Sequence, residues 1–241
     1  MFNFLANPVR FNRVADRIMP WAAGLTAICL GLGLWYALFA SPPDYQQGET
    51  VRIMYVHVPS AWMALFVYSF VAIASAVGLI SRHPLAHLSA QAAAPIGACF
   101  TFLCLATGSL WGKPMWGAWW VWDARLTSVL VLFFLYLGFM ALHNAFDDPA
   151  RGEKSAAILS LVGFVNVPII KFSVDWWNTL HQPASVVKMS GPAIHASMLM
   201  PLLLMAVGFT LFFFCVLIVR IRALLLARRA RALMMANRQA A

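Results

Sequence analysis

Charged side chains are scarce in this chain of 241 residues. Only 10% of the residues are Asp, Glu, Lys or Arg, whereas 62% are hydrophobic and the mean hydropathy is +0.78. A soluble domain carries about 25% charged and 45–50% apolar residues, so this composition argues against an ordinary soluble protein. It predicts a single integral membrane domain of the all-α class.

Cysteine is also scarce, and it follows no metal or redox pattern. The four cysteines lie inside apolar runs and form neither CxxC nor CxxCH, which argues against a thiol redox centre or a cysteine-ligated metal. The phosphate-binding pattern GxxxxGK[ST] does not occur either, so nucleotide hydrolysis by that route is not predicted. We interpret the cysteines as small buried hydrophobic residues.

Six apolar segments are candidates for membrane spans, because a membrane-crossing helix needs about 20 predominantly apolar residues. The fifth candidate is short and ends near Pro168, but without it the arginine-rich C-terminal tail would lie on the opposite side from the N-terminus. Charge therefore favours keeping it. The predicted spans are residues 21–40, 61–80, 92–110, 126–142, 156–170 and 194–219.

The basic residues divide unequally between the two sides that these spans define. The side with both termini carries 12 of the 17 lysines and arginines, and the opposite side carries only five. Because cytoplasmic loops are enriched in Lys and Arg, we expect both termini in the cytoplasm and the first helix to be uncleaved. The net charge of +9 then needs no nucleic-acid partner, since the basic tail at 220–241 is expected at an anionic leaflet surface.

Half of the ten tryptophans lie within twelve positions of one outer segment, residues 111–125, in the sequence WGKPMWGAWWVWDAR. Tryptophan is enriched at membrane interfaces without any ligand, but this density, followed by Asp123 and Arg125, indicates a binding platform. Pro114 suits the first position of a short helix, which would place Asp123 and three of the tryptophans on one face. The tryptophans of the platform are Trp111, Trp116, Trp119, Trp120 and Trp122.

Histidines lie in the outer segments on either side of this platform. His57 precedes the second span in MYVHVPSAW, His181 lies between the fifth and sixth spans, and His195 lies near the start of the sixth span. Neutral imidazole is a common ligand of haem iron, and indole rings stack on flat apolar faces. Together these residues predict a site for a flat iron macrocycle.

Carboxylate groups on such a macrocycle would call for arginine, which binds a carboxylate through two parallel hydrogen bonds. Arg125 and Arg52 are the best-placed candidates, and Lys113 and Lys188 are alternatives. Asp123 can either orient a histidine or pair with Arg125. The remaining histidines fall on the inner side and are expected to be ordinary boundary residues: His83, His87 and His143.

The motif WGAWWVWD at 116–123, together with MYVHVPSAW, resembles the signature of the tryptophan-rich (WWD) haem-handling family of cytochrome c maturation. The likeness covers essentially the whole chain, whose length and six spans are similar to those of the shorter members. It implies that haem b is held at the periplasmic face of the bacterial inner membrane. It also implies that His57 and His181 are the axial ligands, with His195 as an alternative ligand or a residue behind the ligand.

The resemblance further implies binding and transfer of haem rather than catalysis. Haem would pass to the periplasmic chaperone CcmE, and CcmD and the ATP-binding-cassette pair CcmA/CcmB would be partners. No catalytic residue is predicted, although the resemblance leaves open a lyase-like role in attaching haem to the chaperone. The alternative is a cytochrome b-like membrane subunit of a redox enzyme, which would hold haem between histidines inside its spans.

Overall fold

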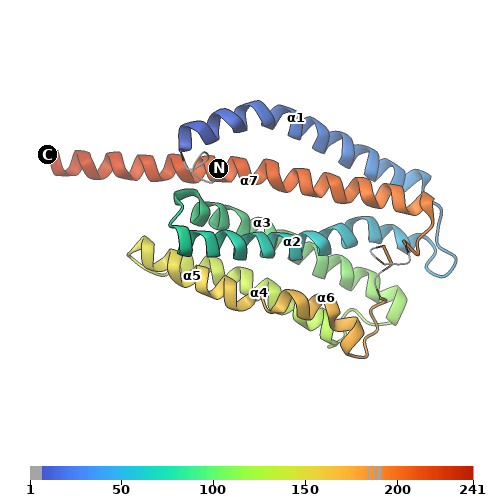
Figure 1. Ribbon diagram of the computed structural model, residues 1–241. Helices are drawn as coiled ribbons and strands as arrows, with labels where there is room; N and C mark the ends of the chain where they lie inside the picture. The colour runs from blue at the N-terminus through green and yellow to red at the C-terminus, as the bar shows by residue number, and fades with distance from the viewer. Residues whose placement is uncertain (1–6, 184, 187, 189–190, 241) are drawn as a thin grey trace.

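The fold is a bundle of long helices that lie roughly along one axis (Figure 1). The computed structural model describes residues 7–183, 185–186, 188 and 191–240, and no β-strand occurs among them. Six helical segments are long and apolar enough to cross a membrane, which confirms the predicted all-α fold with six spans. The elements are α1 (Pro8–Trp35), the π-helical η2 (Tyr36–Ala40), the 3-10 helix η3 (Glu49–Ile53), α2 (Met54–Ser81), α3 (Pro84–Trp116), α4 (Ala124–Asn144), α5 (Pro149–Gly163), α6 (Asn166–Trp176) and α7 (Ala196–Ala240).

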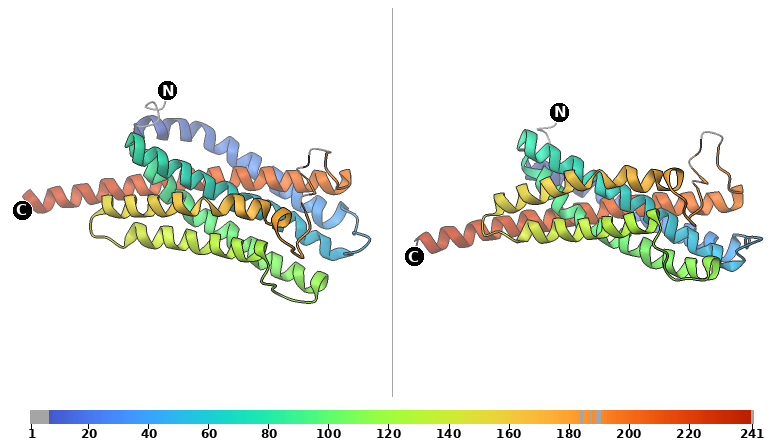
Figure 2. Two further views of the ribbon diagram at one scale, coloured as in Figure 1. Left: turned by 60° about the horizontal axis from the view of Figure 1, so that its bottom comes forward. Right: turned by 90° about the horizontal axis from the view of Figure 1, so that it is seen from below.

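The helices form three layers. α1 packs along α7, α2 and α3 pair in the middle, and α4 lies beside α5 and α6 on the far side. α2 joins the layers because it contacts both α7 and α5. Both termini lie at one end of the bundle, whereas the tryptophan segment after α3 and the start of α7 lie at the other (Figures 1 and 2). We call this second end the outer end.

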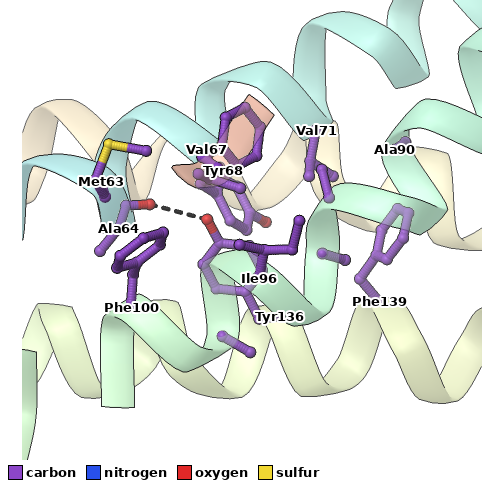
Figure 3. Close-up of a cluster of buried hydrophobic side chains, with 14 of the residues drawn as sticks. Met63, Ala64, Val67, Tyr68, Val71, Ala90, Ile96, Phe100, Tyr136 and Phe139 are labelled. Atoms are coloured by element: carbon purple, nitrogen blue, oxygen red, sulfur yellow. Dashed lines mark hydrogen bonds between the residues drawn. The ribbon is translucent and has the colours of Figure 1, made fainter. Parts of the chain in front are cut away.

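Aromatic and aliphatic side chains fill the centre between α2, α3 and α4 (Figure 3). Tyr68 and Tyr136 are fully buried, and their rings meet edge to face with centroids 5.0 Å apart. The Tyr136 hydroxyl donates a 2.9 Å hydrogen bond to the Ala64 carbonyl (Figure 3). Because a buried hydroxyl without a partner is costly, this bond fixes α4 against α2 below the outer end.

The helices are longer than the spans predicted from hydropathy. A loop is expected over 81–91, but only Arg82 and His83 separate α2 from α3. Arg82 is left-handed, with φ of 49°, and the His83 ring accepts the Leu85 N–H at 3.3 Å, which caps α3. Polar residues that cap and begin a helix resemble a loop in composition, so hydropathy places the helix start too late.

The fifth predicted span consists of two helices. α5 ends at Gly163 and α6 begins at Asn166, and the link is held by short-range bonds such as that from the Val167 N–H to the Phe164 carbonyl (3.0 Å). The Asn166 side chain donates to the Ser128 carbonyl at 2.8 Å, which ties the break to α4. The outer half of this span therefore has its own helix, and α6 presents its side chains to the outer end.

The basic tail predicted at 220–241 continues α7. This helix runs for 45 residues, and its last turns extend beyond the other helices (Figure 1). Arg222 bonds to the Asp16 carboxylate at 2.6 Å, and Arg228 pairs with Glu153. The base of the extension is thereby tied to both α1 and α5.

Candidate functional site

The tryptophan segment does not form the short helix predicted from Pro114. α3 instead continues through Pro114 to Trp116 and ends at Gly117, which has φ of 74° and donates its N–H to the Lys113 carbonyl at 3.0 Å. A position with left-handed backbone directly after a helix favours glycine, and this conformation ends the helix. Residues 118–123 are therefore not helical, and the predicted helical face shared by the tryptophans is wrong.

A cavity of about 440 Å³ lies at the outer end between α2, α3, α4 and α6, and we call it the outer cavity. Its wall is mostly apolar with a few converging polar groups, as is usual for small-molecule sites. Six of the ten predicted site residues line this one cavity. They are His57, His181, Arg125, Trp111, Trp116 and Trp120.

The other two tryptophans of the cluster are not among the described residues that line the outer cavity. The side chains of Trp119 and Trp122 are 55% and 75% exposed. The Lys113 ammonium lies 5.9 Å from the centre of the Trp119 ring, and Trp122 meets Trp120 edge to face at 5.5 Å. The cluster thus divides into a cavity wall and an exposed pair, so it does not form a single flat platform.

His57 lies in the first turns of α2, not in a loop before it, and it is only 9% exposed. Its Nδ1 atom lies 3.1 Å from both the Cys104 carbonyl oxygen and the Thr107 hydroxyl oxygen. Since a carbonyl only accepts, Nδ1 carries the proton, and the lone pair of Nε2 is left free. Metal-ligating histidines are usually held in this way.

Close packing also fixes the His57 ring. A Cβ atom at Gly108 would lie 2.9 Å from Cε1 of this ring, so a larger residue would have to displace it. The Trp111 ring meets the imidazole edge to face with centroids 5.6 Å apart, and its Nε1 donates to the Gln47 side chain at 3.0 Å. Two helices and the loop before α2 therefore hold His57 in place.

His181 lies in the irregular segment between α6 and α7. Its Nδ1 atom lies 2.9 Å from the Gln182 carbonyl oxygen, so this ring also presents an unprotonated Nε2. Burial lowers the pKa of His181 below its ordinary value of 6.5, the Gln182 carbonyl opposes that change, and the nearby Arg125 guanidinium adds to it. The imidazole is therefore neutral at pH 7, which is the form that binds a metal.

His195 has the opposite arrangement. Its Nδ1 accepts the Ser197 N–H at 3.3 Å and lies 2.8 Å from the Ser197 hydroxyl oxygen. The proton of the neutral ring then resides on Nε2. The ring is exposed, and His195 is not among the described residues that line the outer cavity. The geometry therefore favours His181 over His195 as the second ligand.

Only one of the two predicted arginines reaches the outer cavity. Arg125 lines it and donates to the Ser173 hydroxyl at 2.9 Å and to the Lys171 carbonyl at 3.2 Å. It forms no ion pair with any described residue. Arg52 instead pairs with Glu49, and it is not part of the described lining. A guanidinium on the cavity wall that has no ion pair with a described residue is suited to a carboxylate of a ligand.

Asp123 holds two parts of the outer end together. Its Oδ1 accepts the Leu126 N–H at 2.7 Å and caps α4, and its Oδ2 accepts the Thr179 hydroxyl at 2.5 Å. Among the described residues, Asp123 makes no hydrogen bond to Arg125 or to the ring of His181. Neither direct role considered for it from the sequence is therefore the one in the structure.

Several polar lining residues carry no signal that would select them in the sequence. Gln47 and Gln182 lie in irregular segments, and Lys171 and Asp175 share a face only once α6 is known to be a helix. The indole N–H of Trp120 is buried without a hydrogen-bond partner in the described residues. An orphaned donor on a cavity wall is well placed to bond a ligand. The alternative cations Lys113 and Lys188 are exposed and lie outside the described lining.

The cavity is not suited to a bare metal ion. Among the described residues, no group of three or more His, Cys, Asp or Glu side chains is close enough to hold one. An iron bound by two imidazoles needs its other ligands from elsewhere, and the four nitrogens of a porphyrin supply them. The apolar wall, the imidazoles and the free arginine together fit a haem.

Comparison with known proteins also points to haem. Residues 1–236 match the family model described as heme exporter protein C, CcmC. The chain belongs to the heme exporter protein C family. Membership supports a role in haem handling during cytochrome c maturation, and the six membrane-spanning helices make the chain a multi-pass membrane protein.

Relatives named heme exporter protein C are similar over nearly their whole length. That of Bradyrhizobium diazoefficiens is 58% identical over 231 residues, which are 96% of this chain and 88% of the relative. That of Haemophilus influenzae is 50% identical over 226 residues, 94% of this chain and 92% of the relative. That of Escherichia coli K12 is 46% identical over 227 residues, 94% and 91% of the two chains. The family assignment therefore extends over every span.

Proposed function

We propose that this chain binds haem b in the outer cavity, at the periplasmic face of the bacterial inner membrane, and passes it to the haem chaperone CcmE. The observation that carries the proposal is the pair of imidazoles on one apolar cavity. His57 and His181 each have Nδ1 bonded to a backbone carbonyl and therefore a free Nε2. Two such nitrogens can occupy both axial positions of a haem iron.

Other lining groups suit the remaining parts of haem. The indoles of Trp111, Trp116 and Trp120 supply an aromatic wall for the macrocycle, and Arg125 is available for a propionate. The orphaned indole N–H of Trp120 offers a further hydrogen bond to the ligand. Four predicted residues are not among the described residues that line the cavity, and we leave them out of the proposed contacts with haem: Arg52, Trp119, Trp122 and Asp123.

The periplasmic assignment rests on charge. The end of the bundle that carries both termini also carries most of the lysines and arginines, and such ends face the cytoplasm. The outer cavity is at the opposite end and would face the periplasm, from which a chaperone can approach. CcmD and the CcmA/CcmB pair are proposed as partners on the strength of the family. The chain's role is then binding and transfer, and we assign no residue to bond formation on the chaperone.

Absorption and EPR spectra of the detergent-purified protein test the site. We expect six-coordinate, low-spin haem in the unmodified protein and loss of that signature in His57→Ala and in His181→Ala. His195→Ala is the matched control and should leave the spectrum unchanged. If both ligand variants keep the haem content and spectrum of the unmodified protein, the axial assignment is wrong.

Reporter fusions test the orientation separately. A fusion within residues 117–123 should report a periplasmic position, and a fusion after residue 240 a cytoplasmic one. The reverse result would place the cavity on the cytoplasmic side and end the proposed transfer to a periplasmic chaperone.

A further inference from the structure

A hydroxyl group two residues before His181 links the segment that carries this histidine to the start of α4. Thr179 Oγ1 accepts the backbone N–H of His181 at 2.9 Å and donates its own proton to Asp123 Oδ2 at 2.5 Å. A carboxylate can only accept, so the direction of both bonds is fixed. One oxygen atom thus joins the backbone of His181 to the tryptophan motif.

Asp123 is itself held firmly. Its other carboxylate oxygen accepts the Leu126 N–H at 2.7 Å in the first turn of α4, and its backbone N–H donates to the Val121 carbonyl at 2.9 Å. A carboxylate at a helix N-terminus is stabilised by the free N–H groups there and by the helix dipole. The position of Asp123 is therefore set by a membrane-spanning helix, and Thr179 extends that position to the neighbouring segment.

We infer that Thr179 is a positioning residue for the second axial imidazole, and that the aspartate of the tryptophan motif acts through it. This inference rests on the proposed function, because it concerns His181 as an iron ligand. Among the described residues, Thr179 neither lines the outer cavity nor makes a hydrogen bond to the His181 ring, whose Nδ1 is bonded to the Gln182 carbonyl. It acts on where the backbone of His181 lies, and so on whether Nε2 can reach its ligand.

No apolar side chain can replace this hydroxyl. Thr179→Val keeps the shape but leaves both the His181 N–H and Asp123 Oδ2 without their partner. A hydrogen bond to a charged group usually changes an equilibrium by about tenfold or more. We therefore expect Thr179→Val to raise the fraction of haem that lacks the second axial imidazole by about tenfold. Thr179→Ser keeps the hydroxyl and should behave like the unmodified protein.

The test compares EPR and absorption spectra of the full-length, haem-loaded protein in detergent. Thr179→Val should lose low-spin signal and regain it when imidazole is added, because free imidazole fills the open axial position. Thr127→Val is the matched control, since it makes the same change one turn into α4, at a side chain without a hydrogen bond among the described residues. It should keep the spectrum.

Failure of this inference is distinguishable from failure of the proposed function. If Thr179→Val matches the unmodified protein while His181→Ala loses the low-spin signal, Thr179 does not position the ligand, but the haem site stands. If His57→Ala and His181→Ala are both unchanged, the haem site itself is wrong.

Should Thr179→Val fail to fold, Asp123→Asn decides, because its amide oxygen can still cap α4 while the charged partner of Thr179 is lost. A smaller low-spin loss, restored by imidazole, is expected there, and an unchanged spectrum would overturn the inference.

Discussion

The two imidazoles of the proposed site are held by very different means. His57 stands on α2, is bonded to α3, and is enclosed where Gly108 lets the ring approach. His181 lies on an irregular segment, where Thr179 supplies its link to α4. One ligand therefore belongs to the membrane bundle, whereas the other can leave when a segment moves. If the chain passes haem on as proposed, this difference would help release, because only the ligand on the irregular segment would have to move.

The largest expected effect comes from removing each imidazole in turn. His57→Ala should lower haem content by tenfold or more, since it removes the ligand that the helices hold in place. His181→Ala should keep a larger share of haem in a five-coordinate form, and added imidazole should restore the six-coordinate spectrum. Pyridine haemochrome assay and EPR measure both. Equal losses in the two variants would contradict the proposed asymmetry.

The next effect distinguishes Arg125, which lines the cavity, from Arg52, which is not part of the described lining. Arg125→Gln should weaken haem binding by about tenfold, because it removes the guanidinium that the described residues place on the cavity wall. Arg52→Gln should change the dissociation constant less than about twofold, since Arg52 is outside the described lining and is bonded to Glu49 and the Ala37 carbonyl. Titration of the apoprotein with haem, followed by absorbance, gives both constants. A stronger effect at Arg52 would move the carboxylate site to the loop before α2.

A smaller effect is expected from disturbing the packing around His57. Gly108→Ala places a methyl group 2.9 Å from Cε1 of His57, and overpacking of this kind typically costs about 1–3 kcal/mol. The free energy of unfolding should fall by that amount, and the EPR g-values should shift as the ring turns. Gly24→Ala in α1 is the control, because a Cβ atom there meets nothing within 4 Å. Identical g-values in Gly108→Ala would show that the ring is not fixed by this contact.

The smallest expected effect is that of low pH on the binding of iron by His181. The fold lowers the pKa of His181 below 6.5, chiefly by burial, so the neutral ring is favoured. The neutral ring therefore contributes fully to the stability of the packed segment above pH 6.5. This contribution declines as the pH falls from 6.5 toward the lowered pKa. A spectral titration should give a midpoint for loss of this ligand below pH 6.5. In Arg125→Gln that midpoint should rise, because the guanidinium opposes protonation. A midpoint above 6.5 in the unmodified protein would contradict the prediction.

Features encoded locally are predictable from this sequence, and features made by distant contacts are not. Hydropathy suffices for six spans, and the tryptophan-rich segment with Arg125, together with the histidines that those spans place on the same side, suffices to find one cavity wall. The helix expected at Pro114 fails because proline near a helix start and proline in a last turn look alike, and Gly117 decides between them. The part that Gly108 plays depends on a ring 51 positions away in the chain, and that of Thr179 on a carboxylate 56 positions away.

The depth of the outer cavity has a consequence for the cargo. Its lining includes Leu132, eight residues into α4, which corresponds to about 12 Å along the helix axis. Haem bound in the cavity, as proposed, would have one edge at this depth, among the side chains of the bundle. The proposed site would then keep that edge of the macrocycle away from the lipid tails. In the proposed function, the macrocycle would wait in this shielded position until the chaperone collects it.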